Sequence, residues 1–379
     1  MQLFNVYPLY DIEPVRGREV FLWDKNGAPY LDFYGGHAVI SIGHGHPHYV
    51  RRITAQLDQL VFYSNSVQIP LQQELAAKLG ELSGYNDYQL FLCNSGAEAN
   101  ENALKLASFH NGRKLVLAFT GAFHGRTSAA IALTDNPKIR APLNENHEVI
   151  FLPLNDESAL QHAFQRDNIC AVIIEGIQGI AGIQVPEPKF LQKLQTLCAQ
   201  SGAVLILDEI QSGYGRSGKF FAHQFAEIRP DLITVAKGMG NGFPVAGVLI
   251  NPKFKASPGL LGTTFGGNHL ACAAAVAVLE VIAQEKLVEN SEKIGAYLLR
   301  ELRRLTKGVK EVRGRGLMIG VELESACEAV RKKLLFEHGV FTGSSHDPNT
   351  IRLLPPLILK QEHADQFLES FAAVMKNLS

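Results

Sequence analysis

The chain has no excess of charge of either sign and few cysteines, and both absences exclude classes of function. Its 379 residues contain 36 Lys and Arg against 37 Asp and Glu, a formal net charge of -1. The chain therefore lacks the excess of basic residues that is typical of proteins that bind nucleic acid or an anionic membrane surface. The five cysteines are dispersed, odd in number and never spaced as Cys-x-x-Cys. We therefore expect buried free thiols and a reducing compartment.

Patterns of targeting and membrane insertion are also missing. The amino terminus, MQLFNVYPLYDIEPV, has no basic stretch followed by an apolar one, so no secretory signal is expected. The most apolar long stretch, LACAAAVAVLEVIA, contains Glu280 and falls short of a membrane span. With 46% hydrophobic and 19% charged residues, the composition is that of an ordinary soluble globular protein. We expect it in the cytoplasm.

Helix and strand patterns alternate from about Leu71 to Ile250. Apolar, β-branched runs such as CAVIIEG, AVLILD and LITVAK predict buried strands, and segments such as QQELAAKLGEL predict the helices between them. This alternation is typical of an α/β fold with a mostly parallel sheet covered by helices on both faces. Right-handed crossovers then gather the carboxyl ends of the strands at one edge.

The chain is long for one hydrophobic core, and its character changes after Ala271. Long helical segments and short strands there predict a smaller α+β domain over residues 271–379. Residues 47–270 form the predicted large domain. The segment 1–46 contains short strand-like pieces, VFLWD and PYLDF, and we expect it to pack with the small domain. No disordered linker separates these parts, so we expect a cleft between closely packed domains.

Asp208 and Lys237 are the most informative residues of the chain. Each follows an apolar run that predicts a buried parallel strand, and glycine-containing loop sequence comes directly after each. Residues beyond the carboxyl ends of such strands point into the ligand-binding crevice. A carboxylate and a primary amine there suit pyridoxal phosphate (PLP), because the lysine forms a Schiff base and the aspartate keeps the pyridine nitrogen protonated. The pair predicts a PLP enzyme.

Two further loops supply groups that such a cofactor needs. In FLCNSGAEANENALKLA a strand ends and a helix begins, so the Gly96 and Ala97 amides and the Ser95 hydroxyl can hold a phosphate. Ser95 taken alone is equally well explained as a helix N-cap, but its strand–turn–helix position ahead of the Asp208 and Lys237 strands favours phosphate binding. In FTGAFHGRTSAA, Phe123 can stack on the pyridine ring and Arg126 can bind a substrate carboxylate.

Two other patterns suggest different sites and are weaker. GYGRSGK, over residues 213–219, nearly fits a P-loop, but Phe220 stands where Mg²⁺ needs a hydroxyl. A P-loop nucleotide-binding protein, colourless and with affinity for Mg²⁺-nucleotide, is the alternative from another class. GHGHPH, over residues 43–48, suggests a metal cluster, but no Cys or carboxylate cluster stands beside it. We expect a polar loop there and no metal site.

Six motifs in order make the chain resemble the class III (ω-amino acid) aminotransferases of PLP fold type I, and most closely acetylornithine and succinylornithine aminotransferases. They cover the chain from about Leu31 to Ile358 and read NSGAEANENALKLA, GAFHGRT, LILDEIQSGYGRSGK, AKGMGNGFP, GTTFGGNHLACAAA and IRLLPPL. The resemblance implies transfer of the δ-amino group of an N-acylated ornithine to 2-oxoglutarate, as in arginine biosynthesis. Ornithine aminotransferase, 4-aminobutyrate aminotransferase and a related aminomutase remain alternatives.

The resemblance also implies roles for individual residues. Lys237 and Asp208 match the catalytic lysine and the partner of the pyridine nitrogen. The matched cofactor contacts are Gln211, Phe123, Gly96, Ala97 and Thr264, the last supplied by a neighbouring subunit of a homodimer with shared active sites. The matched substrate contacts are Arg126 and Thr263 for the acylornithine, Arg352 for the α-carboxylate of glutamate, and Glu175 in the motif discussed next.

One departure from the family pattern concerns the substrate. Where the family reads E-P-x-Q-G-E-G-G, this chain keeps the first glutamate as Glu175 but has Ile180 at the second. In the family the second glutamate pairs with the arginine matched by Arg352 while the ω-amino substrate is bound. Its loss leaves two hypotheses open: an acid elsewhere compensates, or an ungated Arg352 accepts an extra carboxylate such as that of an N-succinyl group.

Overall fold

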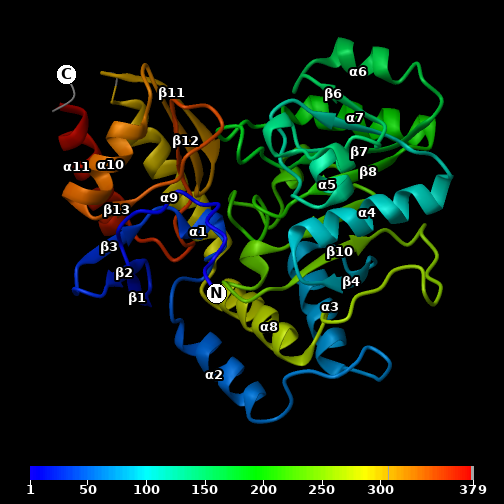
Figure 1. Cartoon of the computed structure of the whole chain (residues 1–379), viewed down its shortest axis with the longest axis horizontal. Helices are drawn as coiled ribbons and strands as arrows, with labels where there is room; N and C mark the ends of the chain where they lie inside the picture. Colours follow the sequence, from blue (N-terminus) through cyan, green and yellow to red (C-terminus); the bar gives the residue numbers. More distant parts are fainter. Residues whose placement is uncertain (306, 377–379) are drawn as a thin grey trace.

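The centre of the molecule is a seven-stranded sheet in the computed structural model, which describes residues 1–305 and 307–376 (Figure 1). Its strands are β4 (Gln89–Cys93), β5 (Leu115–Phe119), β6 (Val149–Leu152), β7 (Ile169–Glu175), β8 (Val204–Asp208), β9 (Leu232–Val235) and β10 (Ala246–Ile250). They lie in the order β4-β10-β9-β8-β7-β5-β6. Neighbours are parallel except where β10 pairs with β4 and β9. The predicted α/β fold with a mostly parallel sheet is confirmed; β6 was not among the predicted strands.

Helices cover both faces of this sheet, which explains why its strands are apolar throughout. Side chains alternate between faces along a strand. In β8, Val204 and Ile206 belong to the core cluster shared with Ala103 of the helix Gly96–Asn111. Leu205 and Leu207 belong to the opposite cluster, with side chains from the helix Pro188–Ser201. Burial on both sides removes the polar alternation that a half-exposed strand needs.

Helix boundaries follow local sequence signals. Two helices begin with proline at the first position and end at a glycine in the left-handed conformation, namely α3, which ends before Gly84, and α7, which ends before Gly202. The helices are α1 (Gly35–Ala38), α2 (Pro47–Leu57), α3 (Pro70–Ser83), α4 (Gly96–Asn111), α5 (Ser128–Ala132), α6 (Glu157–Ala163), α7 (Pro188–Ser201), α8 (His269–Gln284), α9 (Leu287–Arg303), α10 (Glu328–His338) and α11 (Gln361–Lys376). Short 3₁₀ turns cover Pro137–Ile139, Pro142–Asn144, Ala222–Ala226 and Lys237–Met239.

Two small sheets lie beside the large one. The first contains β1 (Pro14–Arg18), β2 (Phe21–Asp24), β3 (Pro29–Asp32) and β13 (Val340–Phe341), and the second contains β11 (Val309–Arg315), β12 (Met318–Leu323) and β14 (Thr350–Leu353). The parallel pairing of β13 with β3 joins the N-terminal strands to the C-terminal part, and Figure 1 shows both next to α10 and α11. The domain limits drawn from the sequence, at 46 and 270, stay predictions.

Helix α8 lies between these parts and packs against α2, α3 and α9. Its apolar side chains are almost all buried, so the most apolar stretch of the sequence is a core helix. Within residues 1–305 and 307–376, no helix has the length and apolar character needed to cross a membrane. All five cysteines are buried and free, as expected.

Candidate active site

The carboxyl ends of the parallel strands meet at a pocket of about 390 Å³. β8 ends at Asp208, β7 ends at Glu175, and Lys237 follows β9. All three residues line the pocket, together with the turn that opens α4 and the loop that follows β5. The sequence therefore predicted correctly which strand ends converge, because parallel strands present their carboxyl ends at one edge.

Asp208 is 4% exposed and is surrounded by hydrogen-bond donors. Its Oδ2 accepts from Nδ1 of His124 at 2.7 Å and from Nδ2 of Asn100 at 2.9 Å, while its Oδ1 accepts from the backbone N–H of Ile210 at 3.1 Å. Three donors stabilise negative charge on the carboxylate and fix its orientation. The sequence analysis identified neither His124 nor Asn100 as a partner of Asp208.

Lys237 stands at the pocket wall in a strained backbone conformation. Its φ is 46°, in the left-handed region that non-glycine residues rarely adopt. Its amine makes no hydrogen bond or ion pair with any residue of the described part of the chain. Removal from water lowers the pKa of Lys237, although the carboxylates of Asp208 and Glu175 act in the opposite direction. The nearby guanidinium of Arg352 adds to the lowering.

Glu175 holds the loops around the pocket together. Its Oε1 accepts from the N–H of Phe123 at 3.0 Å and its Oε2 from the N–H of Gly179 at 2.9 Å. Burial raises the pKa of Glu175. Its carboxylate thus connects the loops that follow two strands. These contacts indicate that Glu175 positions the loops, rather than contacting substrate as predicted.

The turn Ser95–Ala97 opens α4 at one end of the pocket. Ser95 is the N-cap, and its Oγ accepts from the N–H of Glu98 at 3.3 Å. The first N–H groups of a helix have no partner within it, so this end of the pocket presents donors and the positive end of a helix dipole. At Gly96 an added Cβ would lie 2.8 Å from Cδ1 of Ile210. This geometry is compatible both with Ser95 as a phosphate ligand and with Ser95 as a helix N-cap alone.

The remaining predicted residues divide into two groups. Phe123, Arg126 and Gln211 line the pocket. Thr263 lies beside the pocket, where its Oγ1 accepts from Nδ2 of the lining residue Asn94 at 3.3 Å. Thr264 is exposed and does not line the pocket of its own chain.

Arg352 lies behind the pocket on β14 and is 1% exposed. Its NH1 donates to Oε1 of Gln211 at 3.3 Å and its Nε to the carbonyl of Ser344 at 2.5 Å. Burial lowers the pKa of Arg352 to about 10. Within the described chain, no carboxylate lies within ion-pair distance of this guanidinium. The carboxylate of Glu175 acts to raise the pKa of Arg352 from beyond that distance, so no acid in direct contact compensates for Ile180.

A strained turn that the sequence interpretation missed borders the same region. The four residues of α1, from Gly35 to Ala38, all have φ between 54° and 67°. Two of them, His37 and Ala38, are not glycine, and left-handed backbone costs such residues about 1 kcal/mol or more each. The carbonyl of His37 accepts from Nε2 of Gln211 at 3.2 Å. The glycine pair in FYGGHA was the only signal in the sequence.

The P-loop alternative is not supported by its geometry. Residues 213–219 form a buried turn, and the segment that follows is a 3₁₀ turn, Ala222–Ala226, where a P-loop needs a helix. Arg216, within the motif, donates to the carbonyls of Leu317 and Pro355, so the loop connects the two parts of the molecule.

Comparison with known proteins gives one consistent result. The family model described as "Aminotransferase class-III" matches residues 5–375. Acetylornithine aminotransferase 1 of Bordetella pertussis is 40% identical, covering 99% of this chain and 97% of the relative. The solved acetylornithine aminotransferase of Elizabethkingia anophelis has a TM-score of 0.87 at 32% identity, with 99% and 96% covered. An ornithine aminotransferase of Toxoplasma gondii, solved with PLP at partial occupancy in its active site, has a TM-score of 0.90 at 30% identity, with 99% and 93% covered.

Proposed function

Because the chain belongs to the class III aminotransferases, we propose that it transfers the δ-amino group of an N-acylated ornithine to 2-oxoglutarate. The products are an N-acylglutamate semialdehyde and glutamate, a reaction of the arginine-biosynthesis type. One observation carries the proposal: Asp208 and Lys237, from separate strands, share a pocket with the first turn of α4, in a chain similar to acetylornithine aminotransferases.

The residues present fit PLP, the cofactor of this family. The amine of Lys237 has no partner in the described chain and is available to hold the cofactor covalently. Donors at the start of α4 suit a phosphate group, and the carboxylate of Asp208 suits a protonated ring nitrogen. Phe123 supplies an aromatic face at the pocket wall. When bound, PLP supplies an electron sink that makes a substrate C–H bond easier to break.

The chain's own groups move the proton. The lowered pKa of Lys237 favours a neutral amine, which is the form that accepts a proton from Cδ of the ornithine at Nζ and returns it. Asp208 keeps its orientation through His124 and Asn100, so its negative charge lies at a fixed place on the pocket floor. Fixed charge in a site with little water stabilises developing charge without reorganisation.

Carboxylates of the substrates need cationic partners, and two arginines are available. Arg352 is buried without an acidic partner in the described chain, which favours binding of the α-carboxylate of 2-oxoglutarate or glutamate. Arg126, exposed at the pocket rim, and Thr263 suit the acylated amino acid. The absence of an acid beside Arg352 favours an N-succinyl over an N-acetyl substrate in the first half-reaction.

A homodimer accompanies this proposal, because Thr264 is exposed and does not reach the pocket of its own chain. In the dimer its hydroxyl serves the cofactor phosphate of the partner subunit. Sedimentation analysis should give twice the mass of the chain. An active, stable monomer would contradict the assignment of Thr264.

The substrate test uses the PLP-saturated protein with 2-oxoglutarate and one of three amino donors: N-acetylornithine, N-succinylornithine or ornithine. Glutamate formation is measured, and the visible absorbance of the protein-bound cofactor is recorded with each donor alone. We expect turnover with an acylated donor and a higher kcat/KM for the succinyl compound. Preference for free ornithine would replace this proposal with ornithine aminotransferase, the function of the Toxoplasma gondii neighbour.

A further inference from the structure

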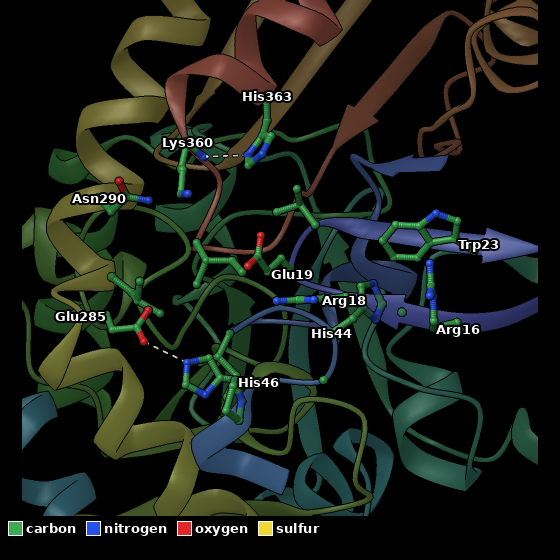
Figure 2. Close-up of a pocket in the computed structure, with 17 residues that line it drawn as sticks. Arg16, Arg18, Glu19, Trp23, His44, His46, Glu285, Asn290, Lys360 and His363 are labelled. Carbon is green, nitrogen blue, oxygen red and sulfur yellow. Dashed lines mark hydrogen bonds and ion pairs between the residues drawn. The ribbon is translucent and has the colours of Figure 1, made fainter. Parts of the chain in front are cut away.

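A second and larger cavity lies at the junction of the N-terminal strands with the C-terminal part (Figure 2). Its volume is about 800 Å³, and it shares no lining residue with the catalytic pocket. The walls come from four stretches of chain: β1 and β2 with the turn between them, the segment that precedes α2, the corner between α8 and α9, and the entry to α11. The proposed reaction uses none of these residues.

Three cationic side chains reach this cavity without acidic partners at hydrogen-bond distance. The guanidinium of Arg18 makes no hydrogen bond or ion pair with any residue described in the structure. The guanidinium of Arg16 stacks over the ring of Trp23, 4.2 Å from its centroid. Nζ of Lys360 approaches only Oε1 of Glu362, at 3.8 Å. Like charges gathered in a concave surface repel one another, and an anion between them reverses that cost.

His363 adds a neutral donor to the same wall. It is 8% exposed, and its Nδ1 accepts from the backbone N–H of Lys360 at 3.2 Å. Burial lowers the pKa of His363, which favours the neutral ring. With Nδ1 accepting, the proton of the neutral ring lies on Nε2. Among the described residues Nε2 has no hydrogen-bond partner, and it approaches Oε1 of Glu362 at 3.7 Å.

Three helices also begin at this cavity. Pro47 opens α2 and Leu287 opens α9, and Lys360 directly precedes α11; all three residues line the wall. Each helix start adds partial positive charge and N–H groups without intrahelical partners. These contributions have the same sign as the charges of Arg16, Arg18 and Lys360, whereas the C-terminal end of α8 at Glu285 adds partial negative charge to the same wall.

Two of the residues that line the cavity are carboxylates, Glu19 and Glu285, and they oppose this positive charge unequally. Oε1 of Glu285 is hydrogen-bonded to Nε2 of His46 at 2.8 Å. The carboxylate of Glu19 has no partner in the described chain, and Figure 2 shows it near the middle of the cavity. The backbone of Glu19 has φ 55°, yet it pairs with the backbone of His44 in both directions at 2.8 Å. The backbone of Glu19 is therefore held in place, and its carboxylate is the one of these two that has no hydrogen bond in the described chain.

We propose that this cavity binds a small polyanion, a molecule with closely spaced phosphoryl or carboxylate groups. Forked guanidinium groups and helix N-termini are the donors that such groups prefer. The volume accommodates more than one anionic group, and the cations stand on separate stretches of chain. The bound polyanion joins the N-terminal strands to the start of α11, so binding stabilises the fold as well as neutralising charge.

Calorimetric titration of the PLP-saturated protein with inorganic pyrophosphate, and separately with citrate, tests the proposal at constant ionic strength. Saturation with PLP keeps the probe out of the phosphate end of the catalytic pocket. The double variant Arg18→Ala/Lys360→Ala should raise the dissociation constant by at least about tenfold. Glu19→Gln should lower it by about threefold, because it removes the opposing charge. Arg166→Ala, at an exposed arginine outside this cavity, is the matched control and should leave it unchanged.

The outcomes separate cleanly. Binding of pyrophosphate alone places the ligand among phosphoryl compounds, and binding of citrate alone places it among polycarboxylates; either supports the proposal when the variants respond as stated. Equal affinity in the double variant would mean that the probe binds elsewhere and would overturn it. Absence of binding by both probes at millimolar concentration, or weaker binding in Glu19→Gln, would also overturn it. Should the double variant fail to fold, Glu19→Gln alone decides.

Discussion

Replacing Asp208 by asparagine removes one negative charge from the pocket floor and keeps the shape of the side chain. The amide oxygen can take the place of Oδ2 and still accept from His124 and Asn100, now at 2.7 and 2.9 Å. The amide NH₂ then faces the N–H of Ile210, which Oδ1 accepts at 3.1 Å in the native protein. We expect this orientation because the opposite one leaves two donors unpaired instead of one.

The stability cost of Asp208→Asn follows from these contacts. One unpaired buried N–H costs about 1–3 kcal/mol. The two remaining hydrogen bonds lose the assistance of a charged acceptor, which is about 1 kcal/mol each. We expect the free energy of unfolding to fall by about 3–5 kcal/mol. Catalysis is affected separately, because the ring nitrogen loses its anionic partner, and kcat/KM should fall by at least about tenfold, or 1.4 kcal/mol.

The assay compares kcat/KM at saturating PLP with the folded fraction from urea titration. Glu209→Gln is the matched control, because the side chain of Glu209 is fully buried and accepts from Ser212 and His223 without lining the pocket. It should lower stability and leave kcat/KM of the folded protein unchanged. A kcat/KM for Asp208→Asn within tenfold of the native value, or equal falls in the two variants, would refute the reasoning.

Three further variants test other parts of the site. Lys237→Ala should abolish turnover, and retained steady-state glutamate formation would contradict the role of its amine. Arg352→Gln should lower kcat/KM for 2-oxoglutarate by about a hundredfold, because a charged hydrogen-bonded contact is worth about 1.5–3 kcal/mol. The half-reaction of an acetylated donor should be affected less. Absorbance measurements of each half-reaction separately test this difference. Although His37 is exposed, partial removal from water and the charges of Arg352 and Lys237 lower its pKa from 6.5 to about 4. Across that window the unfolded chain binds a proton that the folded chain does not, so stability rises with pH. Urea titrations at several pH values should show a shallower rise in His37→Asn; an unchanged slope would count against the shift.

Local sequence determined the parts of the fold that depend on one segment at a time. The apolar run of β8 required burial on both faces, and proline and glycine marked the limits of α3 and α7. The convergence of the strand ends could also be predicted from the sequence, because right-handed crossovers leave one geometry for consecutive parallel strands. The antiparallel direction of β10 was missed, although the connection from Val235 to Ala246 is too short for the helical crossover that a parallel neighbour needs. Strand β6 has four residues at a sheet edge and gives little periodic signal.

The contacts within the site needed the structure. Asn100 lies one turn after Gly96 on α4, and in an amphipathic helix an isolated polar residue resembles a surface position. Its amide reaches both Asp208 and the carbonyl of His124 only because α4 lies directly across the end of β8. The left-handed turn Gly35–Ala38 could not be predicted for the same reason: tertiary contacts, such as the bond from Gln211 to His37, hold it against its local preference.

The environment of Arg352 could be interpreted only from the sequence and the structure together. The sequence could show that Ile180 replaces an acid, and it could not show whether another acid takes over. In the structure the neighbourhood of Ile180 is fixed by its carbonyl, which accepts from the N–H of His346, and the described residues place no carboxylate within ion-pair distance of Arg352. A buried guanidinium without a counter-ion is costly, so the site binds an anion more favourably whenever one is present. A donor with a second carboxylate can supply that anion in the first half-reaction, and 2-oxoglutarate supplies it in the second. We therefore propose that the missing glutamate replaces a gate by a preference for dicarboxylic substrates.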